Sequence, residues 1–310
     1  MLRRDTIERA ATAPPSRFSH GKLIDMPTPT VLQLQLGKEL KRLREARGWT
    51  LAEAVEVLGN KDTKLSRLEN GQSSVRTLDI RVLYETLGAT KEETAWALET
   101  AKHCNQRGRW SGYRSIYGKF FRMAVDLEED ASIINHYQSE MIPGLLQTEA
   151  YIRAVFSASG PQLTDQTLEM ALKARTERQQ VLTKLDAPQI GFVMSESAVL
   201  RMVGDETVMR DQLRYVAEVA ELPNVHLQVL PFKARTYPPG CLFPFTMFRI
   251  PSPGKSGPLE YVYLEDYDDG RYRDDHESVE TYSNLWQRFV GAALDPVQSR
   301  ELLLRLADSY

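Results

Sequence analysis

The chain reads TLAEAVEVLGNKDTKLSRLENG over residues 50–71, and this stretch predicts two short helices joined by a tight turn. Thr50 with Glu53 three residues later is the capping-box pattern that begins a helix. Gly59 can supply the positive φ that a close turn requires. Leu65 and Leu68 then fall on one face of the second helix and anchor it against the first. The stretch therefore predicts a helix-turn-helix.

The second helix of this pair should turn a polar face away from its leucines. We expect Lys64 and Arg67 to contact guanine or phosphate, and Thr63 and Ser66 to contact a base or a phosphate. Asp62 opposes an anion at the helix N-terminus unless it accepts from a cytosine amino group or caps the helix. The alternative interpretation is that this polar face is only a solvent-exposed side of an ordinary helical bundle. The predicted DNA contacts are Thr50, Lys61, Asp62, Thr63, Lys64, Ser66, Arg67, Asn70 and Arg76.

Helical periodicity surrounds this pair. Leucines recur at spacings of four, four and three residues before Gly48, at Leu32, Leu36, Leu40 and Leu43. This is the stripe of an amphipathic helix that Gly48 can end. A fourth helix is expected to turn inward Leu78, Val82, Leu83 and Leu87. A fifth begins at Thr90, so residues 31–103 predict an all-α domain of five helices.

A second domain is expected at residues 119–310, after a linker at residues 104–118 that loses the helical pattern. Helices are expected over residues 120–138, 145–156, 163–185, 206–221, 276–293 and 296–309. Short β-type runs are expected as strands at residues 190–194, 225–230, 245–250 and 259–264. The predicted fold class is thus multidomain, with a five-helix domain followed by an α+β domain whose sheet has about four or five strands.

Residues 34–101, with their glycine turn and the ending LSRLENG, resemble the lambda-repressor-like, or XRE, family of helix-turn-helix transcriptional regulators. The resemblance implies that Thr50 faces phosphate and that the groove is faced by Lys61, Asp62, Thr63, Lys64, Ser66 and Arg67. The chain departs from the family at Leu51, where a DNA-contacting Gln is common. It also departs at Val55, where a small residue is usual, and at Asn60, which replaces an apolar turn residue.

The second domain carries its own resemblance. Its most specific part is the run MIPGLLQTEAYIRAVF at residues 141–156, supported by GFVMSESAVLRMVG, VHLQVLPF and PFTMFRI further on. Over residues 110–306 the chain resembles a C-terminal domain of unknown function that many XRE-type regulators of high-GC Gram-positive bacteria carry. That type is described as antitoxin-like. The resemblance implies a small partner protein encoded beside the regulator, and it assigns no chemistry to the domain.

Composition and motifs argue against other classes. A net charge of −3 does not suit a protein that coats nucleic acid over its whole surface. Cys104 and Cys241 are far apart without a CxxC, which favours a reduced, cytoplasmic protein. No apolar run approaches the length of a membrane helix. In the nearest phosphate-loop pattern Phe120 stands where Ser or Thr must hold magnesium. We therefore expect no enzyme, no cofactor and no metal site.

An acidic run at residues 265–277 does not match a calcium loop and is expected to be a solvated loop. The loop RTYPPGCLFPF at residues 235–245 is more informative. It groups four apolar or aromatic side chains, Tyr237, Pro239, Leu242 and Phe243. Such loops line a ligand pocket or a partner groove, or fold back on their own core.

Together these patterns favour a cytoplasmic homodimer that binds double-stranded operator DNA as a sequence-specific transcriptional regulator. Its C-terminal domain is expected to bind a small neighbour-encoded protein or a ligand. One alternative is an antitoxin-like interaction protein that sequesters a small partner and autoregulates its operon. Another is an enzyme with a DNA-targeting head. Residues 1–30 are expected to be a disordered leader, with Met26 as an alternative translation start.

Overall fold

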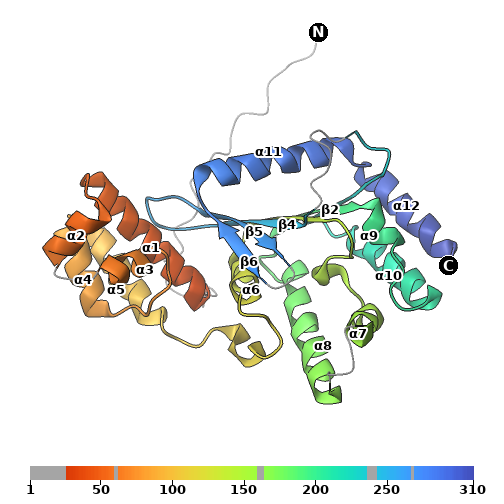
Figure 1. Cartoon of the computed structure of the whole chain (residues 1–310), viewed down its shortest axis with the longest axis horizontal. Coiled ribbons are helices and arrows are strands. Elements are labelled where there is room, and N and C mark those ends of the chain that lie inside the picture. The colour runs from red at the N-terminus through yellow and green to blue at the C-terminus, as the bar shows by residue number, and fades with distance from the viewer. Residues whose placement is uncertain (1–25, 59–61, 159–163, 236–242, 267–268) are drawn as a thin grey trace, which may run out of the picture.

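A computed structural model describes residues 26–58, 62–158, 164–235, 243–266 and 269–310. A helical domain lies at one end of the molecule, beside a larger domain built on a mixed sheet (Figure 1). The predicted fold class is confirmed.

The helical domain consists of α1 (Pro29–Ala46), α2 (Leu51–Leu58), α3 (Asp62–Glu69), α4 (Thr77–Thr86) and α5 (Lys91–His103). Local signals set its helix ends as expected. Gly48 has a φ of +70°, which ends the first helix in the left-handed region. Glu53 N donates to Thr50 Oγ1 over 3.2 Å while Thr50 N donates to Glu53 Oε2 over 2.7 Å, which completes the capping box. The expected turn at Gly59 lies outside the described residues.

The inward face of α4 differs from the prediction. Ile80, Leu83, Tyr84 and Leu87 are buried, whereas Leu78 is 65% exposed and Val82 is 47% exposed. The buried residues follow the i, i+3, i+4, i+7 stripe of one helix face, and Leu78 with Val82 lies on another. Tyr84 can be buried on that face because its hydroxyl donates to Leu36 O over 3.2 Å. The prediction that Leu78 and Val82 face inward is wrong.

Helix α1 belongs to both domains. Leu36 and Leu40 pack into the helical core, while Val31 and Leu34 pack into the main core of the second domain. Gly37 lies against the backbone of Leu68 and Glu69 at the end of α3, where a Cβ would collide with their carbonyl oxygens. The helix therefore forms one wall of each domain.

Two polar contacts also hold the start of α1 to α6 (Phe121–Asp130). Thr30 Oγ1 donates to Asp126 Oδ2 over 2.5 Å, and Thr28 N donates to Asp130 Oδ2 over 2.7 Å. A second junction lies further along α1, where residues 251–258 approach the helix. Lys38 Nζ donates to Pro258 O over 2.7 Å, and Glu39 accepts from the backbone of Ser256.

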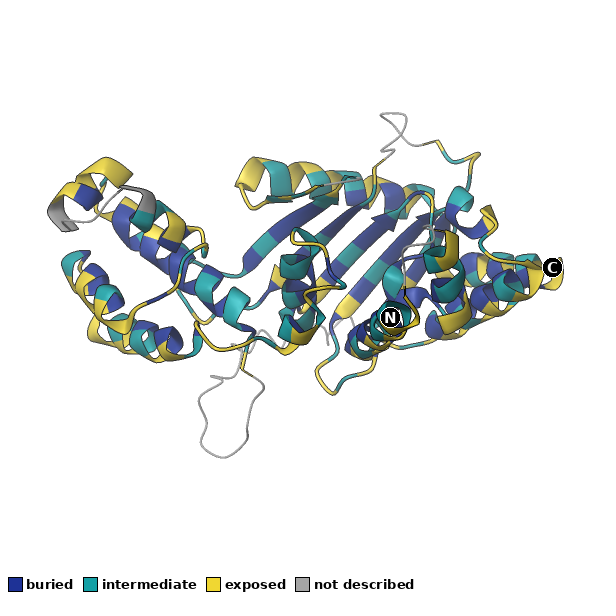
Figure 2. Cartoon of the chain, turned by 60° about the horizontal axis from the view of Figure 1, so that its bottom comes forward, coloured by how far each residue is buried: buried dark blue, intermediate teal, exposed yellow. Residues whose placement is uncertain are grey.

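The described strands form one sheet in the order β3-β2-β1-β4-β5-β6. They are β1 (Ile133–Gln138), β2 (Gln189–Ser195), β3 (Val225–Leu230), β4 (Phe245–Ile250), β5 (Leu259–Glu265) and β6 (Gly270–Arg273). β1, β2 and β3 run parallel, whereas β4, β5 and β6 pair antiparallel. The middle residues of β1 to β5 are mostly buried, as Figure 2 shows.

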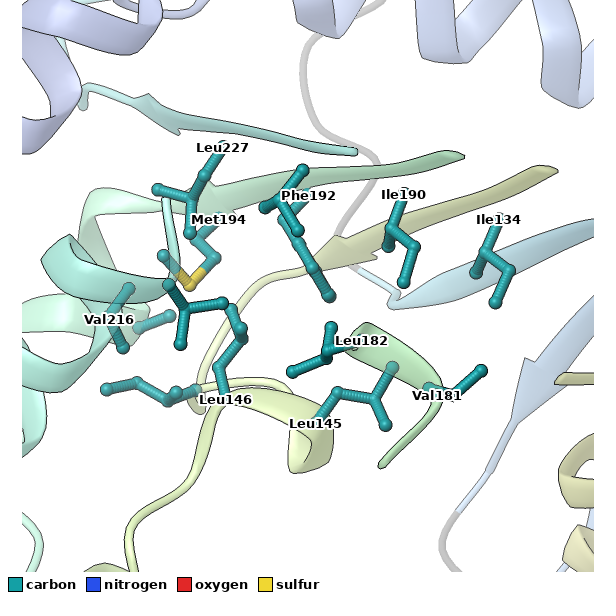
Figure 3. Packing of buried hydrophobic residues seen from close by; sticks show 14 of the residues in the cluster. Ile134, Leu145, Leu146, Val181, Leu182, Ile190, Phe192, Met194, Val216 and Leu227 are labelled. Atoms are coloured by element: carbon teal, nitrogen blue, oxygen red, sulfur yellow. The ribbon is translucent and has the colours of Figure 1, made fainter. Parts of the chain in front are cut away.

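Helices cover both faces of the sheet. The remaining elements are η1 (Arg109–Tyr113), η2 (Gly144–Leu146), α7 (Glu149–Ala158), α8 (Asp165–Gln179), η3 (Gln180–Leu182), α9 (Glu196–Leu200), α10 (Glu206–Val219), α11 (His276–Ala292) and α12 (Pro296–Asp308). On one face Ile134, Phe192 and Met194 meet Leu145 of η2 and Leu182 of η3 (Figure 3). On the other face α11 runs along the sheet and buries Trp286 and Phe289 against alternate strand residues (Figure 1).

Two expectations for the second domain need correction. The helix expected over residues 120–138 ends at Asp130, and Ile133–Gln138 forms β1. β1 is central and is packed on both faces, so its apolar residues do not alternate and its pattern resembles a helix. The acidic run is not a simple loop, because Glu265 ends β5 and Gly270–Arg273 forms β6. The sheet therefore has six strands among the described residues.

The segment expected as a linker, residues 104–118, is packed against the second domain. It contains η1, and Trp110 and Tyr117 are buried against Val125 of α6 and Ala174 of α8. The hydroxyl of Tyr117 donates to Ala174 O over 3.0 Å. The connection is thus a fixed part of the structure.

Candidate nucleic-acid interface

Two kinds of contact hold α3 in place. Leu65 and Leu68 are buried in the helical core, as expected. At the end of the helix, Arg44 of α1 donates to both carboxylate oxygens of Glu69, over 2.7 and 3.0 Å. Arg44 Nη1 also donates to Trp49 O over 2.7 Å, which ties the pair to the start of α2. The hydrogen bonds to Glu69 help to raise the pKa of Arg44.

The opposite face of α3 is turned to solvent. Arg67 and Asn70 are exposed, while Lys64 and Ser66 are partly exposed. The expected orientation of the helix is therefore observed for these four residues. Contact with DNA stays a prediction for each of them.

The cations of this face differ in how far they are already engaged. Lys64 Nζ lies 2.6 Å from Asp79 Oδ2 at the start of α4, so it must leave that partner to reach a phosphate. The guanidinium of Arg67 makes no hydrogen bond or ion pair with any residue that the structure describes. Asn70 Nδ2 donates to Ser66 O over 2.9 Å. Arg67 is thus the cation of α3 most available to a base edge.

Thr50 is more constrained than the sequence suggests. Its hydroxyl donates to Glu53 Oε2 over 2.8 Å and accepts from Glu53 N. These bonds lower the pKa of the Glu53 carboxyl, which therefore stays ionised near the place where a phosphate would approach. A phosphate at Thr50 has to compete with that carboxylate.

Some predicted contacts fall on parts of the chain that are not described. Lys61 lies outside the described residues, and the side chains of Asp62 and Thr63 do too, although both residues are in α3. Arg76 is described. It is exposed and precedes α4 in extended conformation, with φ −103° and ψ 125°.

The connection from α3 to α4 adds residues that sequence reasoning missed. Gln72 and Ser74 are exposed between Asn70 and Arg76. Gly71 holds this turn with a φ of +64°, and a Cβ there would lie 2.8 Å from Leu34 Cδ2. The signal that could have found the two polar residues is their position just after the helix-ending Asn-Gly.

The candidate partner loop of the second domain is described only at its edges. Tyr237, Pro239 and Leu242 lie outside the described residues. Phe243 is 66% exposed at the start of β4, and Phe232 is 66% exposed just after β3.

Two family models match separate parts of the chain. A family model described as a helix-turn-helix domain matches residues 35–97, which confirms the helix-turn-helix prediction. A second model, described as a domain of unknown function (DUF5753), matches residues 121–305. Comparison with curated proteins gives no match. In the described ranges no helix is long and apolar enough to cross a membrane, and no cluster of His, Cys, Asp and Glu suits a metal ion.

Proposed function

The chain belongs to the DUF5753 family, and we propose that it is a sequence-specific transcriptional regulator that acts by binding and not by catalysis. The helix-turn-helix domain at residues 35–97 supports DNA binding. One observation carries the proposal. Arg67 stands exposed on α3 without a protein partner in the described residues, on a helix that Leu65, Leu68 and the Arg44–Glu69 pair hold in place.

A dimer is part of the proposal because one such face is small. α3 has eight residues, and one of its two described cations, Lys64, is engaged with Asp79. A single helix of this kind reads only a few base pairs and neutralises few phosphates. Two copies of the chain would place two such helices in successive major grooves, about 34 Å apart.

The second domain is proposed to bind a small protein or ligand and to change the affinity for DNA. Support comes from α1, which is a wall of both domains and meets the second domain at α6 and at residues 251–258. A binding event that moves either junction moves α1 as well. Switching then requires that the bound molecule prefer one arrangement over the other.

The test begins with the full chain and sheared genomic DNA. Fragments retained by the protein are sequenced, and a recovered site is used for titration at fixed salt. Arg67→Ala should weaken binding by about 1–3 kcal/mol, about 5- to 150-fold, and relax the preference at one base pair. Arg305→Ala, which removes an exposed arginine from α12, should leave the affinity unchanged. No enriched site, or equal affinity for Arg67→Ala, overturns the proposal.

A second candidate function is favoured by Phe232 and Phe243, which are both exposed beside the sheet. Large exposed aromatic side chains are typical of protein-binding surfaces. An antitoxin-like protein of the XRE type would use such a surface to sequester a small partner. Co-expression with the product of the adjacent gene should give a complex that Phe232→Ser with Phe243→Ser disrupts while DNA binding persists. A complex that is equally stable in this variant counts against that surface.

A further inference from the structure

A cavity of about 240 Å³ lies in the second domain, away from the helix-turn-helix. It is partly open to solvent and is lined by residues 116–118 of the packed connection, the start of α6, α7, α8 and the end of β5. Its wall is largely aromatic, with two charged groups. The residues that matter here are Tyr117, Phe120, Phe121, Phe156, Arg175 and Glu265.

Arg175 is the notable group in this wall. It follows Ala171 by one turn of α8, so both residues line the cavity. Its guanidinium lies against Gly144, where a Cβ would collide with it. Among the residues that the structure describes, it has neither an ion pair nor a hydrogen bond. Burial and the neighbouring charge of Arg178 lower the pKa of Arg175 to about 10, which leaves it charged at neutral pH.

Its neighbour Arg178 provides the contrast. Arg178 donates to both oxygens of Glu128 over 2.6 and 2.7 Å, and both side chains are buried. The charge of Arg178 is therefore neutralised within the protein. Arg175, only three residues away, has no such partner in the described chain. Arg175 is partly buried, and a partly buried cation without a counter-ion is destabilising unless something else satisfies it.

A smaller cavity of about 30 Å³ adjoins the first and shares Phe121 and Glu265 with it. Two of its lining residues carry buried polar atoms without a hydrogen-bond partner, His136 Nε2 and Tyr263 Oη. His136 Nδ1 is within 2.9 Å of Thr246 Oγ1, and burial lowers the pKa of His136 to about 3. The ring is therefore neutral. Buried polar atoms are nearly always hydrogen-bonded in folded proteins, so these two point to a bound molecule.

Glu265 stands where the two cavities meet. Its side chain is exposed at the end of β5 and forms no ion pair with Arg175 or Arg178 in the described chain, although both arginines act on its charge and partial desolvation raises its pKa. A molecule that pairs with Arg175 needs an anionic end, and one that also reaches Glu265 would add a hydrogen-bond donor. The aromatic rings between them favour a flat apolar body.

We propose that the two cavities form a binding site for a small organic carboxylate with an aromatic body. The carboxylate pairs with the guanidinium of Arg175, and the ring packs among Phe120, Phe121 and Phe156. The volume is somewhat below the usual range of ligand pockets, so the cavity suits a small molecule of one ring and a short chain. An inorganic anion could use Arg175 but would leave the aromatic wall without a partner.

The site also has a structural route to the DNA-binding end. Its wall includes the connection that leads from the helical domain and the first residue of α6, whose Asp126 and Asp130 hold the start of α1. An effect of the ligand on DNA affinity rests on the proposed function, whereas binding of the ligand does not.

The test is calorimetric titration of the full chain, without DNA, with 3-phenylpropionate as probe. Arg175→Met should weaken binding of the probe at least tenfold. Lys173→Met, which removes an exposed charge from the same helix, should bind as the parent does. The neutral alcohol 3-phenylpropanol should bind the parent chain and Arg175→Met alike. Arg175→Met removes an unpaired charge, so its melting temperature should not fall.

Several outcomes overturn the proposal. They are no binding of 3-phenylpropionate by the parent chain, equal affinity for the acid and the alcohol, or equal affinity in Arg175→Met. Binding of inorganic phosphate with the same dependence on Arg175, without binding of the aromatic acid, means an inorganic anion site and also overturns it. If the probe binds but does not change affinity for a recovered DNA site, the pocket stands and its regulatory role fails.

Discussion

Each of the two domains contains one buried arginine that is bidentate to one buried glutamate. In the helical domain Arg44 pairs with Glu69, and in the second domain Arg178 pairs with Glu128. Each pair joins two helices that are distant in sequence, α1 to α3 and α6 to α8. The geometry of the pairs is nearly the same, and their surroundings are not.

Arg44 makes a third hydrogen bond within the helical domain, to Trp49 O. The pair holds α3 so that Arg67 can face outward. Near Arg178 a second arginine, Arg175, borders a cavity together with Glu265, which has no ion pair among the described residues. A buried Arg–Glu pair thus holds a helix in place in one domain, whereas the equivalent pair in the other domain lies beside a cavity. The two sites differ because charged side chains near Arg178 lack ion-pair partners among the described residues.

The largest expected effect comes from breaking the two pairs. Glu69→Ala and Glu128→Ala should each lower the free energy of unfolding by about 3–5 kcal/mol, because each leaves a buried arginine unpaired. Urea unfolding followed by circular dichroism measures this loss. Glu301→Ala, an exposed control on α12, should change stability by less than about 0.5 kcal/mol.

Added phosphate should affect the stability of these two variants differently. The cavity beside Arg178 gives an anion access in Glu128→Ala, so added phosphate should recover part of the lost stability. Glu69→Ala should gain nothing comparable, since neither of the two cavities described above borders Arg44. Equal recovery in both variants would contradict the distinction drawn between the two sites.

A smaller effect is expected at the outward face of the helical domain. Arg76→Ala should weaken binding to all DNA sequences alike, because an exposed arginine before α4 is placed for phosphate and not for a base. The slope of log affinity against log salt should become shallower by about 0.9. Titration at several salt concentrations gives that slope. A change in base preference, as expected for Arg67→Ala, would instead assign Arg76 to the groove.

The junctions between the domains should respond to pH in opposite ways. Burial raises the pKa of Asp130 to about 6, above its value in the unfolded chain. The folded state then binds more protons, so stability from Asp130 is full below about pH 4 and is lost as the pH rises through 6. Asp130→Asn should reduce this pH-dependent loss in the free energy of unfolding by about 1–2 kcal/mol. The figure is smaller than the full pKa shift implies because the carboxyl is partly exposed.

Glu93 gives the reverse sign. A hydrogen bond from Thr90 N, with Lys255 and Arg42 nearby, lowers the pKa of Glu93 to about 2. Its contribution is present above about pH 4.5 and is lost as the pH falls toward 2. Urea unfolding of the parent chain, Asp130→Asn and Glu93→Gln between pH 3 and 7 tests both signs. A parental fall between pH 4 and 6 that survives in Asp130→Asn would remove Asp130 as its cause.

The smallest expected effect concerns α4. Leu78→Ser should change the free energy of unfolding by less than about 0.5 kcal/mol, because Leu78 is 65% exposed. Leu83→Ala, five residues later and 1% exposed, should cost about 2–5 kcal/mol. Thermal unfolding of the two variants compares them directly. A large loss from Leu78→Ser would mean that this face is covered in solution, as in a dimer.

Much of the helical domain could be predicted because its signals are local. The capping box of Thr50 and Glu53 and the left-handed Gly48 act over a few residues. The same holds for Ser195, whose side chain accepts from Ser197 N and caps α9. Periodicity placed Leu65 and Leu68 inward and so turned Arg67 outward. It failed at β1 and at Leu78, where more than one helical or extended face fits the same apolar residues.

Neighbours along the chain set which segments form helices around the turn and which side of α3 is polar, so these features follow from local sequence. Long-range packing is what makes α1 part of both domains and brings Arg44 to Glu69 across 25 positions. It alone placed Arg178 on Glu128 while leaving Arg175 beside a cavity with Glu265, ninety positions away. Arg175 and Arg178 lie three residues apart on one helix, yet they differ in role. The reason is that tertiary packing, and not residue type, determines which ion-pair partner each arginine has.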